Sequence, residues 1–288
     1  MEDNELCWCG SHKLYKDCHK EFDIKCEEKR KMGYLVPPRS MIKNDEQIEG
    51  IRVAGIVNDG LLDEIEKSIH ERMTTEEIDR IATIFLKEHD AESADYHYEG
   101  YPKHLCTSVN DVVCHGIPSD YVILKDGDII NVDATTCYKG YYADASRMFV
   151  IGNAKENALR LVKVTKECLE EGIKAIKPFE STLNDIGIAI EKYAHKFGYS
   201  VVEEFCGHGV GLKMHEEPYV LHYSVKEKTY LLVPGMVITI EPMINEGKRF
   251  IHIDFKDRWT VRTNDQKLSA QWENTMVITK DGVKILSK

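Results

Sequence analysis

Along the first half of the chain, apolar residues recur three or four positions apart and then give way to β-prone segments. Asn44 followed by Gln47 is a candidate capping box, and the apolar positions after it predict a long helix. Thr74 and Glu77 form a second such signal before another helix. Residues 105 to 151 are rich in Val, Ile, Tyr and Thr and are interrupted by turn signals, which predicts strands.

The same order of elements recurs in the second half of the chain. Helical periodicity covers residues 157 to 176, Thr182 is the candidate cap of a further helix, and strand-like segments follow from Val201. No strong residue-level repeat accompanies this recurrence. We therefore expect an α/β (α+β) fold of two related helix-helix-strand halves, near 44 to 154 and 155 to 288, with a site between them.

Composition and charge narrow the class of protein. The chain is 42% apolar and 30% charged, and it lacks a long uncharged apolar run, so we expect a soluble protein without a membrane span. The acidic start MEDNELCWCG is unlike a secretory signal, which favours the cytoplasm. A net charge of −11 argues against indiscriminate binding to nucleic acid or acidic membranes. Nine cysteines are better explained as metal ligands and buried thiols than as disulfides.

Two aspartates lie in the apolar, β-prone segment GDIINVDATTCYKGYYADASRMFVIG. If Lys139 and Gly140 form a two-residue hairpin turn, Asp133 faces Ser146, and Asp133 and Asp144 share one face of the sheet. Such diagonal neighbours lie roughly 7 to 8 Å apart. Unpaired carboxylates are costly in apolar surroundings, and a bound cation would neutralise them. Taken alone, the two aspartates are explained equally well as solvent-exposed residues at the ends of strands.

Three later segments add further candidate ligands in similarly apolar or glycine-rich surroundings. His208 lies between glycines in CGHGVGLKMHEEP, Glu241 lies in MVITIEPMI, and Glu273 lies in LSAQWENTMVI. Two Asp, two Glu and one His form an oxygen-dominated set that suits a pair of divalent ions such as Mn²⁺, Fe²⁺ or Co²⁺, with Zn²⁺ also eligible. The ligand types alone do not name the metal.

Six motifs in one order and spacing resemble those of type I methionine aminopeptidases of metallopeptidase family M24, over about residues 44 to 288. They are VCHGIP, the segment from Asp133 to Asp144, GHGVG, HEEP, IEPM and the stretch from WTVRT to LSAQWEN. The resemblance implies a two-half pita-bread fold and hydrolysis of the N-terminal methionine from nascent polypeptides, preferentially before a small second residue. It also implies a dinuclear centre with Asp144 and Glu273 as bridging ligands. The implied ligand set is Asp133, Asp144, His208, Glu241 and Glu273.

The same resemblance suggests roles for further residues. Glu241 would take the proton of the attacking water, while His215 would hydrogen-bond the carbonyl or oxyanion and His115 the scissile nitrogen. A histidine considered singly is more often structural. Met214 departs from the family pattern, which usually has an aromatic residue just before the histidine that matches His215. The positions that match the family's methionine pocket, for which ordinary core packing is the alternative, are Tyr98, Tyr101, Cys106 and Trp259.

A cluster of cysteines lies near the start of the chain, in CWCGSHKLYKDCH. The spacing of Cys7, Cys9, Cys18 and His19 resembles the SEC-C motif at the tail of bacterial preprotein-translocation ATPases. The segment is too short for a hydrophobic core of its own, so we expect one structural Zn²⁺ to stabilise it. The alternative is a set of reduced cysteines in an unstructured tail.

Composition also suggests how the chain is divided. Pro37 and Pro38 disfavour regular structure, and we expect a zinc-binding motif at residues 1–30, a linker at 31–43 and a catalytic domain at 44–288. Residues 10 to 43 carry nine basic and five acidic groups. We hypothesise that residues 1–43 dock a monomeric enzyme on the ribosome or a ribosome-associated protein.

Two rival interpretations share the fold. An aminopeptidase P or prolidase-like enzyme has similar metal ligands but usually carries a large N-terminal domain, whereas 43 residues precede the catalytic region here. A catalytically inactive pita-bread binding protein would have lost metal ligands, and all five are present here. Release of methionine from Met-Ala-Ser, compared with cleavage of Xaa-Pro peptides, separates these interpretations.

Overall fold

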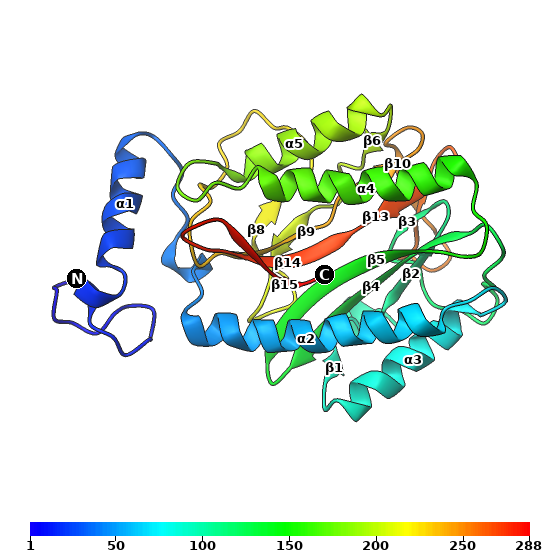
Figure 1. Ribbon diagram of the computed structural model, residues 1–288, viewed down its shortest axis with the longest axis horizontal. Helices are drawn as coiled ribbons and strands as arrows, with labels where there is room; N and C mark the ends of the chain where they lie inside the picture. Colours follow the sequence, from blue (N-terminus) through cyan, green and yellow to red (C-terminus); the bar gives the residue numbers. More distant parts are fainter.

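Four long helices and a large sheet form the body of the molecule, and a small N-terminal part projects from one end (Figure 1). The computed structural model describes residues 1–288. Three short 3₁₀ helices are η1 (Tyr15–Asp17), η2 (Arg39–Met41) and η3 (Tyr98–Gly100). The α-helices are α1 (Lys20–Lys31), α2 (Asp45–Ser68), α3 (Thr75–Glu88), α4 (Glu156–Lys174) and α5 (Leu183–Lys196).

The strands form one large sheet and two small ones. The path of the nine-stranded sheet is β1 (Glu92–Ser93), β4 (Ile129–Tyr138), β5 (Tyr141–Val150), β14 (Glu273–Ile278), β9 (Val237–Ile240), β7 (Gly207–Gly209) and β8 (Glu216–Val220). Beside this path, β2 (Cys106–Val109) pairs with β4, and β15 (Val283–Ser287) pairs with β14. The small sheets are β13 (Ser269–Gln271), β10 (Met243–Asn245) and β6 (Ser200–Val201), and β11 (Ile251–Ile253), β12 (Val261–Thr263) and β3 (Val112–Cys114).

The predicted helix starts are confirmed by their capping contacts. Asn44 accepts the Gln47 N–H at 2.9 Å, and the Gln47 side chain accepts the Asn44 N–H at 3.0 Å. Thr74 closes the equivalent box at the start of α3. Thr182 does so before α5, with an aspartate as its partner. Each box satisfies backbone donors that the first helical turn leaves free, which fixes where the helix begins.

The predicted hairpin between β4 and β5 is also confirmed. Lys139 and Gly140 have φ values of 51° and 81°, as a two-residue type I′ turn requires, and Asp133 pairs with Ser146. Because side chains alternate along a strand, Ile130, Val132 and Ala134 of β4 pack into the apolar cluster below α2 and α3. The polar residues between them face the opposite side of the sheet.

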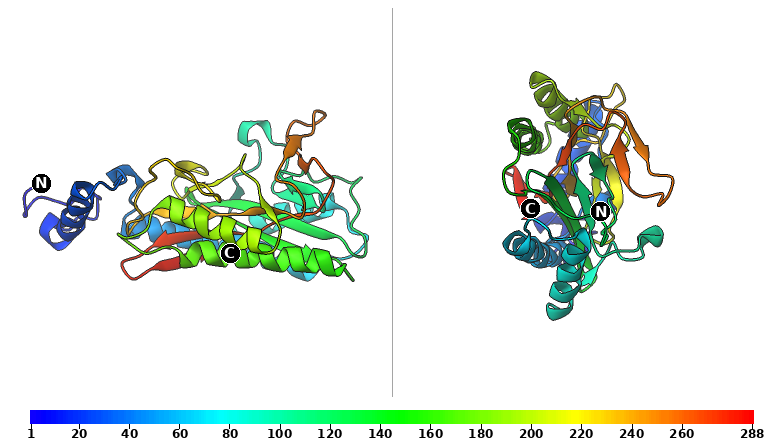
Figure 2. Two further views of the ribbon diagram at one scale, coloured as in Figure 1. Left: turned by 90° about the horizontal axis from the view of Figure 1, so that it is seen from above. Right: turned by 90° about the vertical axis from the view of Figure 1, so that its right-hand side faces the viewer.

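The helices cover one face of the large sheet and leave the other for the site. Figure 2 shows the helices gathered on one side, with the β11–β12 hairpin projecting on the other. The pair α2–α3 packs against strands of the first half, and α4–α5 covers strands of the second half (Figure 1). The halves join where β5 pairs with β14, Ser146 opposite Glu273. This arrangement confirms the expected two-half α/β fold.

The N-terminal part is attached to the second half by apolar contacts. Cys26 of α1 belongs to the same buried cluster as the α4 and α5 core, and Trp8 and Phe22 pack against that cluster. The rings of Phe22 and Phe179 lie 5.8 Å apart. A segment of only about 30 residues therefore uses the core of its neighbour because it is too small to enclose one of its own.

Residues 31–43 follow a fixed course along the second half. Leu231 donates its N–H to the Leu35 carbonyl at 2.8 Å, and Lys43 donates its N–H to the Gly235 carbonyl at 2.8 Å. Met41 is buried between these attachments. The division into units at residues 30 and 43 stays a prediction.

No helix in the structure combines the length and the apolar character needed to cross a bilayer.

Candidate active site

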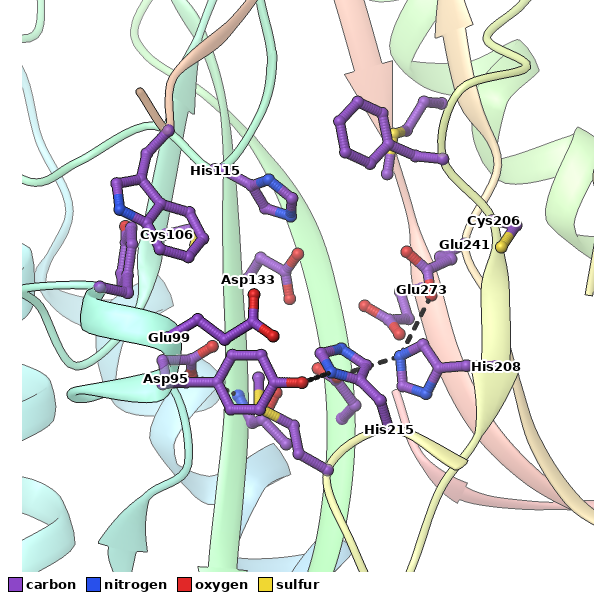
Figure 3. Close-up of a pocket in the computed structure, with 18 of the residues that line it drawn as sticks. Asp95, Glu99, Cys106, His115, Asp133, Cys206, His208, His215, Glu241 and Glu273 are labelled. Carbon is purple, nitrogen blue, oxygen red and sulfur yellow. Dashed lines mark hydrogen bonds and ion pairs between the residues drawn. The ribbon is translucent and has the colours of Figure 1, made fainter. Parts of the chain in front are cut away.

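A cavity of about 370 Å³ opens on the face of the sheet that the helices do not cover. Both halves line it, and in Figure 3 His115 and Asp133 face His208, Glu241 and Glu273 across it. The cavity brings together every residue between positions 98 and 273 that the sequence analysis proposed as a metal ligand, a catalytic group or a substrate contact. They are Tyr98, Tyr101, Cys106, His115, Asp133, Asp144, His208, Met214, His215, Glu241, Trp259 and Glu273.

Strand register places the carboxylates in neighbouring rows. Asp133 and Glu273 are both paired with Ser146, which lies between them on β5, so the two acids flank one residue. Asp144 lies two residues before Ser146 and points to the same face. Glu241 directly follows β9, whose last residue is paired with the neighbour of Glu273. Four acids that are far apart in sequence thus meet at one end of the cavity because their strands are adjacent.

The imidazole of His208 is oriented toward these carboxylates. Its Nδ1 lies 3.0 Å from the carbonyl oxygen of Gly209, which can only accept a hydrogen bond, so Nδ1 carries the proton. The lone pair of Nε2 then faces Asp144 at 3.8 Å and Glu241 at 3.6 Å. Ligand atoms of Asp144, His208 and Glu273 all lie within 4.8 Å of one another. This is the arrangement of a histidine held ready for a metal ion.

Burial and repulsion make the carboxylate cluster costly without a cation. Oδ1 of Asp144 and Oε1 of Glu273 are buried and have no hydrogen-bond partner. Burial, followed by repulsion from Asp144, raises the pKa of Asp133 and Glu273 well above their usual range and that of Glu241 to about 8. Unpaired, desolvated oxygens of this kind fit divalent metal ions, which would supply the missing partners and charge.

Two threonines hold the ligands in place. The hydroxyl of Thr239 accepts the His208 N–H at 3.0 Å and donates to Oε1 of Glu241 at 2.8 Å. The hydroxyl of Thr275 accepts the Asp144 N–H at 3.1 Å and donates to the Asp144 carbonyl at 2.8 Å. Sequence reasoning missed these contacts. The available signal was a threonine two residues from each glutamate, a spacing that places both side chains on the same face of an extended segment.

The two candidate catalytic histidines approach the cavity from opposite sides. Nδ1 of His215 lies 2.9 Å from the Tyr98 hydroxyl, and its ring centroid lies 4.3 Å from that of His208. His115 has a left-handed backbone, with φ of 54°, and its ring packs edge-on against Phe205. Burial lowers the pKa of His115 to about 4, so this imidazole is neutral at pH 7.

Aromatic side chains form the apolar end of the cavity. Tyr101 is buried, and its hydroxyl lies 3.1 Å from each of two main-chain carbonyl oxygens. Its ring meets Trp259 edge-on at 5.1 Å, and Cys106 lies beside Asp133 in the strand register. Asp95 also lines this wall and accepts the Thr135 N–H at 3.0 Å. Nothing in the sequence pattern pointed to this acid as a lining residue.

The N-terminal cysteine cluster forms a second candidate metal site. The ligand atoms of Cys7, Cys9, Cys18 and His19 all lie within 4.8 Å of one another. Nδ1 of His19 lies 3.3 Å from Sγ of Cys7 and 3.1 Å from Sγ of Cys18, and Sγ of Cys9 lies 3.6 Å from Sγ of Cys18. Four such donors around one point are typical of a structural metal site.

Comparisons with known proteins agree with both sites. Residues 49–280 match the model of metallopeptidase family M24, and residues 4–21 match the SEC-C motif. A methionine aminopeptidase of Chlamydia pneumoniae is 43% identical over 100% of this chain and 99% of its own length. One of Escherichia coli K12 is 47% identical over 85% of this chain and 93% of its own.

Structural similarity leads to the same family. The crystal structure of a methionine aminopeptidase from Rickettsia prowazekii superposes with a TM-score of 0.83 at 40% identity, over 86% of this chain and 99% of that one. The matched family model covers the strands that carry all five proposed catalytic ligands. The chain therefore belongs to metallopeptidase family M24, among the methionine aminopeptidases, and carries an N-terminal SEC-C motif.

Proposed function

We infer that this enzyme removes the N-terminal methionine from polypeptides by metal-dependent hydrolysis. The observation that carries this inference is the convergence of three buried acids, the half-buried Asp133 and His208 at one end of a cavity whose other end is aromatic. The acidic end suits divalent cations, and the aromatic end suits a thioether side chain. Family membership and the resemblance to methionine aminopeptidases at 43–47% identity support the same activity.

We assign two divalent ions to Asp133, Asp144, His208, Glu241 and Glu273. When bound there, such ions lower the pKa of a water molecule and polarise the carbonyl of the scissile peptide. Asp144 and Glu273, which the family resemblance suggests would contact both ions, each have a buried oxygen without a hydrogen-bond partner that a cation would satisfy. The donor set is compatible with Co²⁺, Mn²⁺, Fe²⁺ or Zn²⁺.

We assign the proton transfers to side chains that reach the cavity. Glu241 accepts the proton of the attacking water, with its carboxylate held by the Thr239 hydroxyl. His215 hydrogen-bonds the carbonyl oxygen through Nε2, because its Nδ1 is engaged by the Tyr98 hydroxyl. His115 hydrogen-bonds the scissile nitrogen from the opposite wall.

We place the methionine side chain against Tyr98, Tyr101, Cys106, Met214 and Trp259. Aromatic rings and sulfur atoms make favourable contacts with a thioether, and an unbranched side chain fills an irregular apolar space well. We expect small second residues to be preferred, as in type I enzymes.

We assign a structural Zn²⁺ to Cys7, Cys9, Cys18 and His19. Three thiolates and one imidazole are a common zinc ligand set, and a metal supplies the stability that so short a segment lacks. All nine cysteines of the chain are unpaired, which is typical of a reducing compartment. We accordingly propose that the enzyme works in the cytoplasm.

We also propose that residues 1–43 dock the enzyme on the ribosome or a ribosome-associated protein. On α1 and just after it, Ile24 and Met32 expose 49% and 68% of their surfaces beside a cluster of basic side chains. Basic side chains favour contact with an acidic partner such as ribosomal RNA. Charge reversal of Lys25, Arg30 and Lys31 in the full chain is expected to reduce co-sedimentation with ribosomes, and unchanged co-sedimentation would reject this docking.

The activity is tested with tripeptides. Methionine should be released from Met-Ala-Ser faster than from Met-Leu-Ser, only with a divalent ion present, while Xaa-Pro peptides stay intact. Preferential cleavage of Xaa-Pro peptides would identify a prolidase-like enzyme instead, and no cleavage of any peptide would indicate a binding protein. For the histidines, His115→Ala and His215→Ala should each lower turnover with the metal content unchanged; wild-type turnover would remove that residue from the mechanism.

A further inference from the structure

The turn that carries Met214 and His215 is tied to a carboxylate outside the metal centre. Glu216, the first residue of β8, accepts the N–H of Leu212 at 2.7 Å and that of Lys213 at 2.9 Å on its Oε1. The carboxylate therefore closes the turn on itself just before the strand that pairs with β7, the strand of His208. Through these two hydrogen bonds the carboxylate holds the backbone that leads to His215.

The same carboxylate is anchored by a buried lysine. Nζ of Lys43 lies 2.5 Å from Oε2 of Glu216, and the two side chains expose only 2% and 15% of their surfaces. The partners are separated by 173 positions in the chain. Lys43 is itself fixed, because its N–H donates to the Gly235 carbonyl and the next residue caps α2. Both carboxylate oxygens of Glu216 thus have partners: Oε1 accepts the two N–H groups of the turn, and Oε2 pairs with the Lys43 ammonium group.

The far end of the turn is also confined. Gly211 has a φ of 136°, and a Cβ built on it would lie 2.2 Å from Cδ1 of Ile51 on α2. Its carbonyl accepts the Tyr142 N–H at 2.9 Å. With one end packed on α2 and the other held by the ion pair, the turn presents His215 to Tyr98 and His208 in one position.

We propose that Lys43 is a positioning residue of the active site. Its ammonium group fixes the Glu216 carboxylate, the carboxylate fixes the 211–215 turn, and the turn places the His215 imidazole. Lys43 precedes the segment that matches the family model, residues 49–280, so a residue outside that segment contributes to the catalytic geometry. The proposal rests on the function proposed above for His215. A neutral side chain at position 43 would leave a mostly buried carboxylate without its counter-charge.

The test compares Lys43→Met with Lys13→Met in the full-length, metal-loaded protein. Lys13 is a matched control because it also pairs with an acid, Asp45, but on the exposed surface and away from the turn. We expect Lys43→Met to speed hydrogen exchange at the Leu212 and Lys213 amides and to lower kcat/KM by about tenfold, since small misplacements of a catalytic group are costly. Lys13→Met should change neither. Unaltered exchange at the turn in Lys43→Met would overturn the proposal.

A double-mutant cycle separates positioning from general destabilisation. If Lys43 acts through His215, adding Lys43→Met to His215→Ala should leave kcat/KM within about twofold of the single variant. An equal further loss in that background would show that Lys43 acts elsewhere.

If Lys43→Met fails to fold, the pair Lys43→Met with Glu216→Gln removes both charges and avoids a buried unpaired ion. The kcat/KM of this double variant should stay low although its Tm recovers. Recovery of both quantities would show that Lys43 contributes only to stability. Wild-type protein that releases no methionine would instead reject the proposed function, and the exchange rates would still decide whether Lys43 holds the turn.

Discussion

The two candidate metal sites of this molecule are built in opposite ways. The ligands of the catalytic centre come from strands of the large sheet, whose backbones are held by inter-strand hydrogen bonds and by buried residues such as Ile238 and Met276. The ligands of the N-terminal site come from 13 consecutive positions, Cys7 to His19, in which only Cys7 and Tyr15 are buried. At the catalytic centre the fold itself brings the candidate ligands together. At the N-terminal site we expect a bound metal to stabilise the segment that carries the ligands.

Loss of a catalytic ligand is expected to have the largest effect on activity and little effect on stability. Glu273→Gln removes one of several acids that repel one another in a buried space, so the Tm of the metal-free protein should stay equal or rise. Activity should fall by more than about 100-fold, since even the loss of a group that only supports a metal ligand costs up to about that much. Tripeptide turnover and a thermal melt measure the two effects. Wild-type turnover, or a collapse of the melting temperature, would contradict the comparison.

Loss of an N-terminal ligand should have the opposite result, a local loss of stability with little change in activity. Cys18→Ser is expected to release one equivalent of metal and to speed hydrogen exchange locally within residues 1–31, because we propose that the metal stabilises a segment with few buried side chains of its own. Tripeptide turnover should stay within about threefold, because no residue of the cavity comes from this segment. Metal analysis and hydrogen exchange measure the loss. Cys137→Ser, which alters a cysteine outside the cluster, is the control and should retain the metal.

Substitution of Asp23, in α1, should disturb the same region less than loss of a cysteine ligand. Asp23 accepts hydrogen bonds from Trp8 at 3.2 Å, Tyr15 at 2.8 Å and Arg39 at 2.7 Å, so it ties the metal cluster to residues 31–43. Asp23→Ala leaves three donors without their acceptor and should cost the N-terminal part about 1–3 kcal/mol of local stability. Faster exchange confined to residues 1–43, at unchanged turnover, is the expected result. Uniform exchange rates across the variant and the parent would show that the carboxylate is dispensable.

Local signals explain what the sequence could predict. Each capping box and the Lys139–Gly140 turn depend on residues three or four positions apart, so the helix starts and the β4–β5 register could be derived directly. The register in turn brings Asp133 and Asp144 to one face. The remaining catalytic ligands needed the motif resemblance, because no local rule states which distant strands become neighbours in a sheet.

Contacts that depend on the tertiary structure were beyond such rules. The packing of Trp8 and Phe22 against the second-half core joins segments more than 150 positions apart, and nothing in residues 1–43 specifies that partner. The same holds for the Thr239 hydroxyl between two ligands and for Asp95 on the cavity wall. These side chains are ordinary strand or loop residues in sequence, and their roles come only from what the fold places beside them.

The smallest expected effect concerns the junction of the two regions, at Asn44. This side chain caps α2 and also donates from Nδ2 to the Cys9 carbonyl at 2.7 Å, so one residue serves both the catalytic body and the metal cluster. Thr74 caps α3 in the same way but contacts nothing in the N-terminal part. Each substitution by alanine should lower global stability by about 1 kcal/mol, the usual worth of a cap.

The two alanine variants should differ in which backbone amides exchange faster. Asn44→Ala removes a further hydrogen bond, so it should also accelerate exchange at amides around Cys9, whereas Thr74→Ala should leave those amides at the parent rate. Chemical denaturation and hydrogen exchange on the same samples provide both numbers. Equal exchange near Cys9 in the two variants would mean that the Asn44 hydrogen bond does not stabilise the cysteine cluster. The apolar contacts of Trp8 and Phe22 would then be what connects this cluster to the catalytic domain.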